Sequence, residues 1–236
     1  MTAANTTVLR SHGLKGGTLA NDVLHRLRED IISCVLKPGE KLRFEALREI
    51  YGVSFSTLRE ALSRLASESL VVSEGQRGFS VSPISKDDLM DVTDVRVLIE
   101  RECIRRSIVN GDAEWKSHVL SSFHRLDRME AALADQHRVT PEWDRLHFEF
   151  HESLVAASGS PTLQELRRAL FERARRYRRI SALVRKAPRV KTDEHRFIME
   201  AVIGGDTEAA EDLMERHIRE IAQNVLNNMS QIEDAA

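Results

Sequence analysis

The chain has 236 residues, of which 42% are hydrophobic and 31% are charged, and its formal net charge is −2. This length is enough for one large or two ordinary globular domains, and the nearly neutral charge excludes nucleic-acid binding through bulk basicity alone. Two cysteines are too few for a disulfide framework. No apolar run approaches the ~18–20 residues of a membrane span, and the polar N-terminus lacks a signal-peptide core, so we expect a cytoplasmic protein.

The first predicted element is a helix from Thr18 to about Val35. Residues 1–17 show no hydrophobic periodicity and are predicted to be a flexible arm. Apolar residues then recur at helical spacing until Pro38 and Gly39 interrupt the pattern. The predicted core side of this helix consists of Leu19, Val23, Leu27, Ile31 and Ile32.

Two shorter helices joined by a tight turn are predicted next. The first runs from Phe44 to Tyr51, and Gly52 ends it because glycine tolerates the left-handed conformation. Ser54 is a suitable N-cap for the second helix, which runs to about Ser67. The predicted apolar stripes are Phe44, Leu47 and Ile50 on the first helix, and Leu58, Ala61, Leu62 and Leu65 on the second. The pattern describes a helix-turn-helix or, as the alternative, an ordinary helical hairpin.

A short β-hairpin is predicted directly after the second of these helices. Val71–Val72 and Phe79–Val81 are β-branched or aromatic runs, and the tip between them carries Arg77 between two glycines. A hairpin in this position is the wing of a winged helix, and a slim tip can approach the DNA backbone or the minor groove. The alternative is a surface hairpin without a function. Helix, turn, helix and wing together favour nucleic-acid binding by residues 18–82.

The remainder of the chain predicts an all-α bundle of six or seven helices. Residues 83–85 are a short linker, and Ser85 followed by Asp88 resembles a capping box. The predicted domain covers 86–230, followed by a tail at 231–236. Its amphipathic segments, separated by Gly and Pro, are 86–110, 113–136, 141–157, 161–185, 189–204 and 206–230.

Histidines are the main chemical feature of this predicted bundle. His147 and His151 are four residues apart on one helix, and His195 and His217 come from the last two helices. Asp144 lies near the same stripe, seven residues before His151. Neutral imidazoles with a carboxylate can bind zinc or nickel inside a bundle. The alternative is that these histidines are surface residues or hydrogen-bonded core residues.

The N-terminal motifs resemble the winged-helix domain of GntR-type bacterial transcription regulators. The resemblance rests on Lys37–Leu42 (KPGEKL), Gly52–Leu65 (GVSFSTLREALSRL) and Gly75–Val81 (GQRGFSV), which occur in order at family spacing over about 65 residues. It implies that Arg59 contacts the operator major groove. It also implies DNA contacts near phosphates or bases from Ser54, Ser56 and Thr57, and minor-groove contacts from Arg77 and Gly78. Phe55 is a departure, because many members carry arginine there.

The C-terminal residues are similar to the all-helical effector (FCD) domain of the FadR branch of this family. Phe150–His151, Glu194–His195 and His217 match its signature, whereas His147 stands where an Asp is usual. The implied ligand set is four imidazoles, or Asp144 substitutes from one turn away. Arg96 matches a family arginine that points towards the effector pocket, where it would pair with a carboxylate. The alternative for Arg96 is an ion pair with Glu100 at i+4.

The predicted function is a metabolite-responsive transcription repressor that binds a pseudo-palindromic operator in double-stranded DNA as a homodimer. A small carboxylate effector beside a divalent metal, zinc or alternatively nickel, would release the DNA by population shift. Several motifs are similar to the carbon-starvation-induced regulator group, whose effectors are short dicarboxylates such as glutarate. The alternatives are a metalloenzyme that uses the histidines and a winged-helix scaffold that binds protein.

An arginine-rich stretch covers residues 167–186. It could be a second nucleic-acid surface or a wall of an anion site. We instead expect most of it to be a solvated helix face paired with acidic neighbours, because charge runs usually are. Arg175, Arg176 and Tyr177 remain candidates for lining the pocket.

Overall fold

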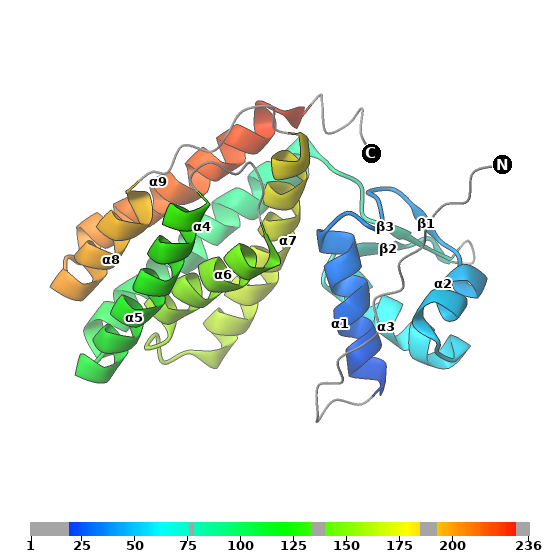
Figure 1. Ribbon diagram of the computed structural model, residues 1–236, viewed down its shortest axis with the longest axis horizontal. Helices are drawn as coiled ribbons and strands as arrows, with labels where there is room; N and C mark the ends of the chain where they lie inside the picture. The colour runs from blue at the N-terminus through cyan, green and yellow to red at the C-terminus, as the bar shows by residue number, and fades with distance from the viewer. Residues whose placement is uncertain (1–18, 76–77, 134–139, 185–192, 230–236) are drawn as a thin grey trace.

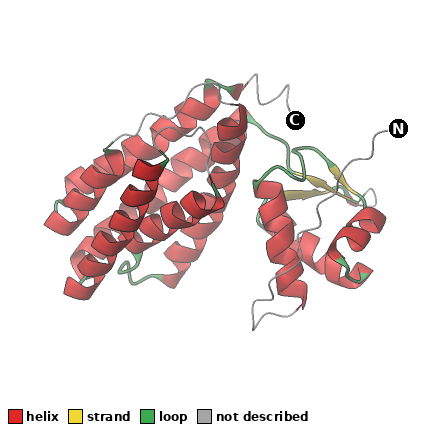
Figure 2. Cartoon of the chain, viewed as in Figure 1, coloured by secondary structure: helices red, strands yellow, loops and turns green. Residues whose placement is uncertain are grey.

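The computed structural model describes residues 19–75, 78–133, 140–184 and 193–229. Within these ranges the chain forms an N-terminal winged helix-turn-helix and a C-terminal bundle of helices, which lie side by side (Figure 1). Strands occur only in the N-terminal part of the described chain (Figure 2). The predicted fold, mostly helical with a winged helix followed by a helical bundle, is confirmed.

The N-terminal domain packs three helices against a small antiparallel sheet. The strand order is β1-β3-β2, and Leu42 pairs with Phe79 while Val71 pairs with Val81. Strand β1 was not predicted. The elements are α1 (Leu19–Ile32), β1 (Lys41–Leu42), α2 (Phe44–Tyr51), α3 (Phe55–Ser67), β2 (Val71–Ser73) and β3 (Phe79–Val81).

The turn between α2 and α3 forms as predicted. Gly52 adopts φ 67°, and its N–H donates to the carbonyl of Arg48, which closes α2. The hydroxyl of Ser54 then accepts a hydrogen bond from the backbone N–H of Thr57 at 3.2 Å and caps α3. The predicted buried stripe of α3 is confirmed for Leu58, Ala61, Leu62 and Leu65.

Two residues predicted to face this core are exposed instead. Leu19 is 61% exposed, because it is the first residue of α1 and lies beyond the packed turns. Ile50 is 62% exposed, and Tyr51 is buried in its place. The Tyr51 hydroxyl donates to a carboxylate oxygen of Asp30 at 2.5 Å, which ties α2 to α1 and turns Ile50 outward. Helix α1 also ends at Ile32, earlier than predicted.

The C-terminal bundle contains six helices within the described residues, and five of their starts agree with the predicted ones to within one residue. The predicted helix ends at 134–136 and 185 and the predicted start at 189 lie outside the described residues, as do the arm 1–17 and the tail 231–236. The helices are α4 (Lys86–Asn110), α5 (Ala113–Ala132), α6 (Pro141–Val155), α7 (Pro161–Val184), α8 (Glu194–Gly204) and α9 (Thr207–Leu226).

Side-chain caps start several of these helices. The side chains of Asp112, Thr140 and Asp206 each accept a backbone N–H from the first turn of α5, α6 and α9. Ser85 caps α4 in the same way. The second half of its predicted capping box is replaced, because the Ser85 N–H donates to the hydroxyl of Tyr177 on α7 at 3.4 Å. The start of the bundle is therefore tied to α7.

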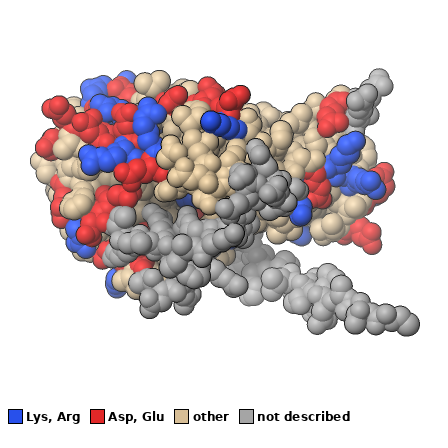
Figure 3. Space-filling view, turned by 90° about the horizontal axis from the view of Figure 1, so that it is seen from above, with Lys and Arg blue, Asp and Glu red and all other residues tan. Residues whose placement is uncertain are grey.

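The two domains meet where α1 contacts α7 (Figure 1). Among the described side chains on the face in Figure 3, acidic and basic groups are intermixed over the bundle, so no single charge dominates there. Within the described residues, no helix combines the length and the apolar character that crossing a bilayer requires.

Candidate metal centre and DNA-binding surface

Four histidines from three helices meet in the interior of the bundle. His147 and His151 lie one turn apart on α6, His195 begins α8 and His217 lies in the middle of α9. All four are at most 3% exposed. One ring nitrogen from each can be chosen so that the four atoms lie within 4.8 Å of one another. This convergence, predicted as one of two alternatives from the spacing, is a buried four-histidine cluster.

The electrostatic environment keeps the imidazoles of His147 and His151 neutral. Burial lowers the pKa of His147 and of His151 well below the ordinary 6.5, and the neighbouring arginines and histidines lower it further. Neutral imidazole is the form that binds a metal ion. The Nε2 atoms of His147, His151 and His195 are buried and have no hydrogen-bond partner among the described residues. Such unpartnered buried ring nitrogens are costly, and a divalent metal would satisfy those that carry a lone pair.

Carboxylates hold two of the rings from behind. Nδ1 of His217 lies 2.7 Å from a carboxylate oxygen of Glu194, and Nδ1 of His195 lies 3.3 Å from one of Glu130. A carboxylate on Nδ1 fixes the proton there and leaves Nε2 available as a ligand. Glu194 belongs to the Glu194–His195 pair that matches the family signature, whereas nothing local identified Glu130. The donor set and its supports therefore fit a metal of the zinc or nickel class.

His147 differs from the other three histidines. Its Nδ1 lies 3.4 Å from Nη1 of Arg178. A guanidinium only donates, so in this contact Nδ1 accepts and the ring proton lies on Nε2. His147 must lose that contact or change tautomer to bind a metal through Nε2.

Asp144 is the alternative metal ligand on α6, but its carboxylate forms ion pairs with arginines of α7 and is not part of the four-histidine cluster. Its carboxylate oxygens are 3.4 Å from Arg178, 3.3 Å from Arg179 and 3.7 Å from Arg175. With 3% exposure, this carboxylate is the buried counter-ion of α7. The four-imidazole set is therefore the one that the geometry brings together.

Arg96 is buried beside this cluster. Its Nε lies 3.5 Å from Glu100, so the i+4 ion pair expected as the alternative is present. Nevertheless, Nε and Nη2 have no hydrogen-bond partner among the described residues. The guanidinium lies 4.9 Å from the Phe171 ring centroid, and its charge contributes to lowering the pKa of His151. A buried cation with unused donors next to histidines can accept an anion.

Most arginines of α7 are paired with acidic residues as predicted, but apart from Arg168 they are not exposed to solvent. Arg167 is 1% exposed and donates to Glu100 at 2.8 Å, to Glu152, and to the carbonyl of His151 at 2.9 Å. Arg176 and Arg178 are also buried. Their carboxylate and carbonyl partners come from other helices and from the residue before the linker, which sequence spacing could not reveal. Residues 185 and 186 lie outside the described residues.

The helix-turn-helix presents the predicted polar groups to solvent. Ser54 and Ser56 are exposed at the start of α3, and the Ser54 Oγ lies 2.9 Å from the hydroxyl oxygens of both Ser56 and Thr57. Arg59 is exposed one turn later and makes no salt bridge with another described residue. Gly78 in the wing has φ 97°, which favours glycine. Arg77 lies outside the described residues.

Comparison with known proteins assigns both halves of the chain. Residues 91–220 match the FCD domain, and residues 19–81 match the bacterial regulatory proteins of the gntR family. The chain is 37% identical over 202 residues to the HTH-type transcriptional regulator BphR of Paraburkholderia xenovorans (85% of this chain, 82% of that protein). It is also 37% identical over 196 residues to the HTH-type transcriptional repressor GlaR of Escherichia coli (81% and 89%).

A solved structure has the same fold. A GntR transcriptional regulator from Rhodococcus sp. RHA1 superposes with a TM-score of 0.68 at 24% identity, covering 88% of this chain and 97% of that one. The chain therefore belongs to the GntR family of DNA-binding transcription regulators, in the group whose C-terminal domain is an FCD domain, and not to a family of enzymes.

Proposed function

We propose that this regulator is a homodimeric repressor that leaves its pseudo-palindromic operator when a small carboxylate binds beside a divalent metal in the bundle. The observation that carries the proposal is the buried group of four histidines with the Arg96 guanidinium next to it. The name of the E. coli relative, a transcriptional repressor, supports the sign of regulation. Short dicarboxylates such as glutarate are the effectors to test first.

The chemistry of the site favours an anionic effector. His147, His151, His195 and His217 would hold the metal, which is zinc or alternatively nickel. When bound, the metal supplies a positive charge that attracts one carboxylate oxygen. Arg96 would pair with the other oxygen through its unused donors. Glu100, the ion-pair partner of Arg96, also pairs with Arg167 at 2.8 Å, so a ligand anion would add a second counter-charge to Arg96.

Contacts of α7 support a route from this site to the DNA-binding domain. Arg175 lies 3.7 Å from Asp144, one turn before His147, and also donates to Glu29 of α1 at 2.9 and 3.1 Å. Arg176 donates to the carbonyl of Ser82, which directly precedes the linker. A ligand that disturbs the α7 arginines would therefore change how α1 is held, and with it the spacing of two DNA-binding heads.

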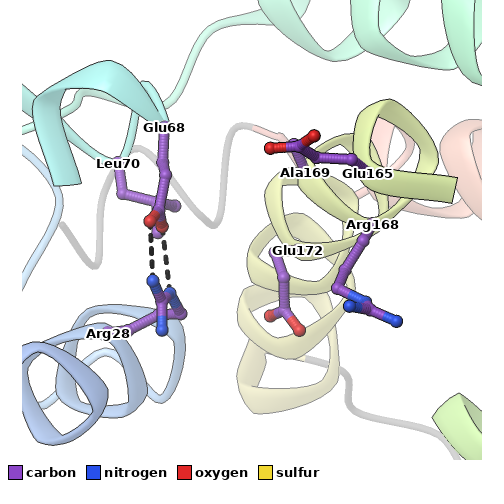
Figure 4. A pocket seen from close by; sticks show the side chains of 7 residues that line it. All are labelled: Arg28, Glu68, Leu70, Glu165, Arg168, Ala169 and Glu172. Carbon is purple, nitrogen blue, oxygen red and sulfur yellow. Dashed lines mark hydrogen bonds and ion pairs between the residues drawn. The ribbon is translucent and has the colours of Figure 1, made fainter. Parts of the chain in front are cut away.

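The junction between the domains is suited to such movement. A pocket of about 310 Å³ lies between Arg28, Glu68 and Leu70 of the N-terminal domain and the start of α7 (Figure 4). The α7 side of the pocket is largely charged, with Glu165, Arg168 and Glu172 among its lining residues. Charged residues from both domains line this pocket, and the ion pair between Arg175 and Glu29 joins α7 to α1 at the same junction.

We propose DNA contacts for the polar residues at the start of α3 and in the wing. Arg59 would read the major groove, and Ser54, Ser56 and Thr57 would lie near phosphates or bases. Arg77 and Gly78 of the wing would approach the minor groove. Dimerisation would place two copies of α3 about one helical turn apart on the operator.

The test uses genomic fragments that the purified protein retains. We expect a mobility shift that weakens with salt, is lost in Arg59→Ala and is kept in Arg64→Ala, whose side chain pairs with Glu60 at 3.0 Å on the same helix. Adding glutarate to the metal-loaded complex should release DNA from the wild type but not from Arg96→Gln. A protein that retains no DNA at any salt concentration would favour the protein-binding scaffold instead.

A further inference from the structure

An exposed aromatic ring stands at the start of α3. Phe55 is the first residue of that helix and, unlike the buried residues that follow it on the apolar stripe, is 45% exposed. Its ring stacks on Phe44 of α2 with centroids 4.4 Å apart and an interplanar angle of 24°. Phe44 in turn contacts the edge of Phe79 on β3, with centroids 5.9 Å apart. The position of the Phe55 ring is therefore fixed by its stack on Phe44 of α2, which itself packs on Phe79 of β3.

This ring lies among groups that belong to the DNA-binding surface. Ser54 precedes it, Ser56 follows it and Arg59 is one turn further along, and all three are exposed. The first residues of the second helix of a helix-turn-helix are those that reach base edges. An aromatic side chain held at that place, with one side on Phe44 and the other in solvent, is available to a base pair.

We propose that Phe55 reads the C5-methyl group of a thymine in each operator half-site. A phenyl ring has no hydrogen-bond donor or acceptor, and the thymine methyl is the apolar group that the major groove presents. The stack on Phe44 reduces the side-chain freedom that the contact would otherwise cost. This proposal rests on the proposed function, in which α3 lies in the major groove. The contact would add a preference for thymine that the polar side chains of α3 do not provide.

The position of the thymine follows from helix geometry. Phe55 and Arg59 are four residues apart on α3, which corresponds to a rise of about 6 Å. Successive base pairs are about 3.4 Å apart along the duplex. The methyl group read by Phe55 is therefore expected within about two base pairs of the base that Arg59 contacts.

The experiment combines selection with removal of a single methyl group. Full-length wild type and Phe55→Ala each select sequences from a randomised duplex library, and thymines of the wild-type sequence are then replaced one at a time by deoxyuridine. We expect the wild type to enrich one thymine that Phe55→Ala does not. Deoxyuridine at that position should weaken DNA binding by the wild type about fourfold, which corresponds to the ~0.8 kcal/mol that burial of one CH₂ group contributes. The same replacement should leave DNA binding by Phe55→Ala unchanged. Phe197→Ala, which removes a 51% exposed ring from α8, is the matched control and should behave like the wild type.

The outcomes separate this proposal from DNA binding itself. If deoxyuridine has no effect at any thymine of the half-site, or if Phe55→Ala selects the wild-type sequence, Phe55 is only a cap on Phe44 and the proposal is wrong. If neither protein enriches any sequence, the placement of α3 in the groove is wrong as well. Should Phe55→Ala unfold, the deoxyuridine series on the wild type decides alone.

Discussion

Glu194 and His217 form a carboxylate–imidazole pair across the interface of α8 and α9, with Oε2 2.7 Å from Nδ1. The pair holds the His217 ring in one orientation and directs Nε2 into the four-histidine cluster. We predict that Glu194→Gln lowers the affinity for zinc about 10- to 100-fold, the usual cost of losing such a support. Competition against a chromophoric chelator measures this affinity.

Glu200→Gln is the control for this change. Glu200 lies on the same helix but is exposed to solvent, so its substitution should leave zinc affinity as in the wild type. Equal zinc affinities for Glu194→Gln and Glu200→Gln would show that the carboxylate does not support a metal ligand.

His147 should contribute less to metal affinity than His195. The Arg178 contact on Nδ1 of His147 favours the tautomer with a proton on Nε2, whereas Glu130 favours the opposite tautomer of His195. We therefore expect His147→Gln to retain a measurable fraction of the zinc affinity and His195→Gln to lose most of it. Isothermal titration of the metal-stripped variants provides the comparison. Identical losses in the two variants would mean that His147 abandons Arg178 when the metal binds.

The pH dependence of stability follows from the buried histidines. Burial holds the pKa of His147 and of His151 well below 6.5 in the folded protein, whereas in the unfolded chain they take up protons near 6.5. Above pH 6.5 these two histidines are neutral in both states and do not change the free energy of unfolding. Below pH 6.5 the free energy of unfolding falls as the pH falls, because only the unfolded state gains protons. The metal-stripped protein should lose up to about 2.7 kcal/mol per pH unit below pH 6, from two protons at ~1.36 kcal/mol each.

Urea unfolding of the metal-stripped protein between pH 7.5 and 5.5 measures this slope. The variant His147→Gln should reduce it by about half, while the exposed His118→Gln should leave it unchanged. A wild-type stability that is constant over this range would contradict neutral burial of the two rings.

The helix pattern could be predicted because it depends on local signals, whereas the histidine cluster is predicted from the spacing of His147 and His151 together with the resemblance to the FCD domain. Ser54, Gly52 and Ser85 mark helix ends through hydrogen bonds within a few residues, and the apolar period reveals which side is buried. Strand β1 could not be predicted, since Lys41 and Leu42 are too short a run to show alternation and form a strand only by pairing with β3.

Long-range pairing explains the remaining differences. The arginines of α7 look like a solvated run in the sequence, but Glu29, Glu100 and Asp144 from three other helices neutralise them inside the protein. The exposure of Ile50 likewise depends on the bond between Tyr51 and Asp30, which are 21 positions apart. No pattern within one helix contains that information.

The ion pair between Arg175 and Glu29 should control communication between the domains. If α7 transmits the state of the histidine cluster to α1, then Glu29→Gln uncouples the two without removing any DNA or metal contact. We predict that the ratio of DNA Kd values for metal-loaded and metal-stripped protein moves towards one in this variant. Fluorescence anisotropy with a retained genomic fragment gives both values.

The control for this coupling is Arg105→Gln, which breaks an exposed pair with Glu102 within α4 and should keep the wild-type ratio. Arg175→Gln should resemble Glu29→Gln, and the double variant should add little to either, because both remove one interaction. A wild-type ratio in Glu29→Gln would place the coupling elsewhere.

Gly111 follows the last residue of α4, and its φ is not in the left-handed region. We expect substitution by alanine to be less well tolerated there than at Gly204, the other such glycine described in the bundle. A Cβ at this position would lie 1.9 Å from Cε3 of Trp115 and 2.6 Å from the carbonyl oxygen of Ser107. The indole cannot yield, because it is 7% exposed and its N–H donates to the carbonyl of Ser153 at 2.8 Å. We predict that Gly111→Ala lowers the free energy of unfolding by about 1–3 kcal/mol through overpacking. Gly204→Ala, where nothing lies within 4 Å of the added Cβ, should be neutral or stabilise α8 by up to about 1 kcal/mol. Thermal and urea unfolding of both variants measure the difference, and equal stabilities would show that Trp115 packs against α4 less tightly than the structure has it.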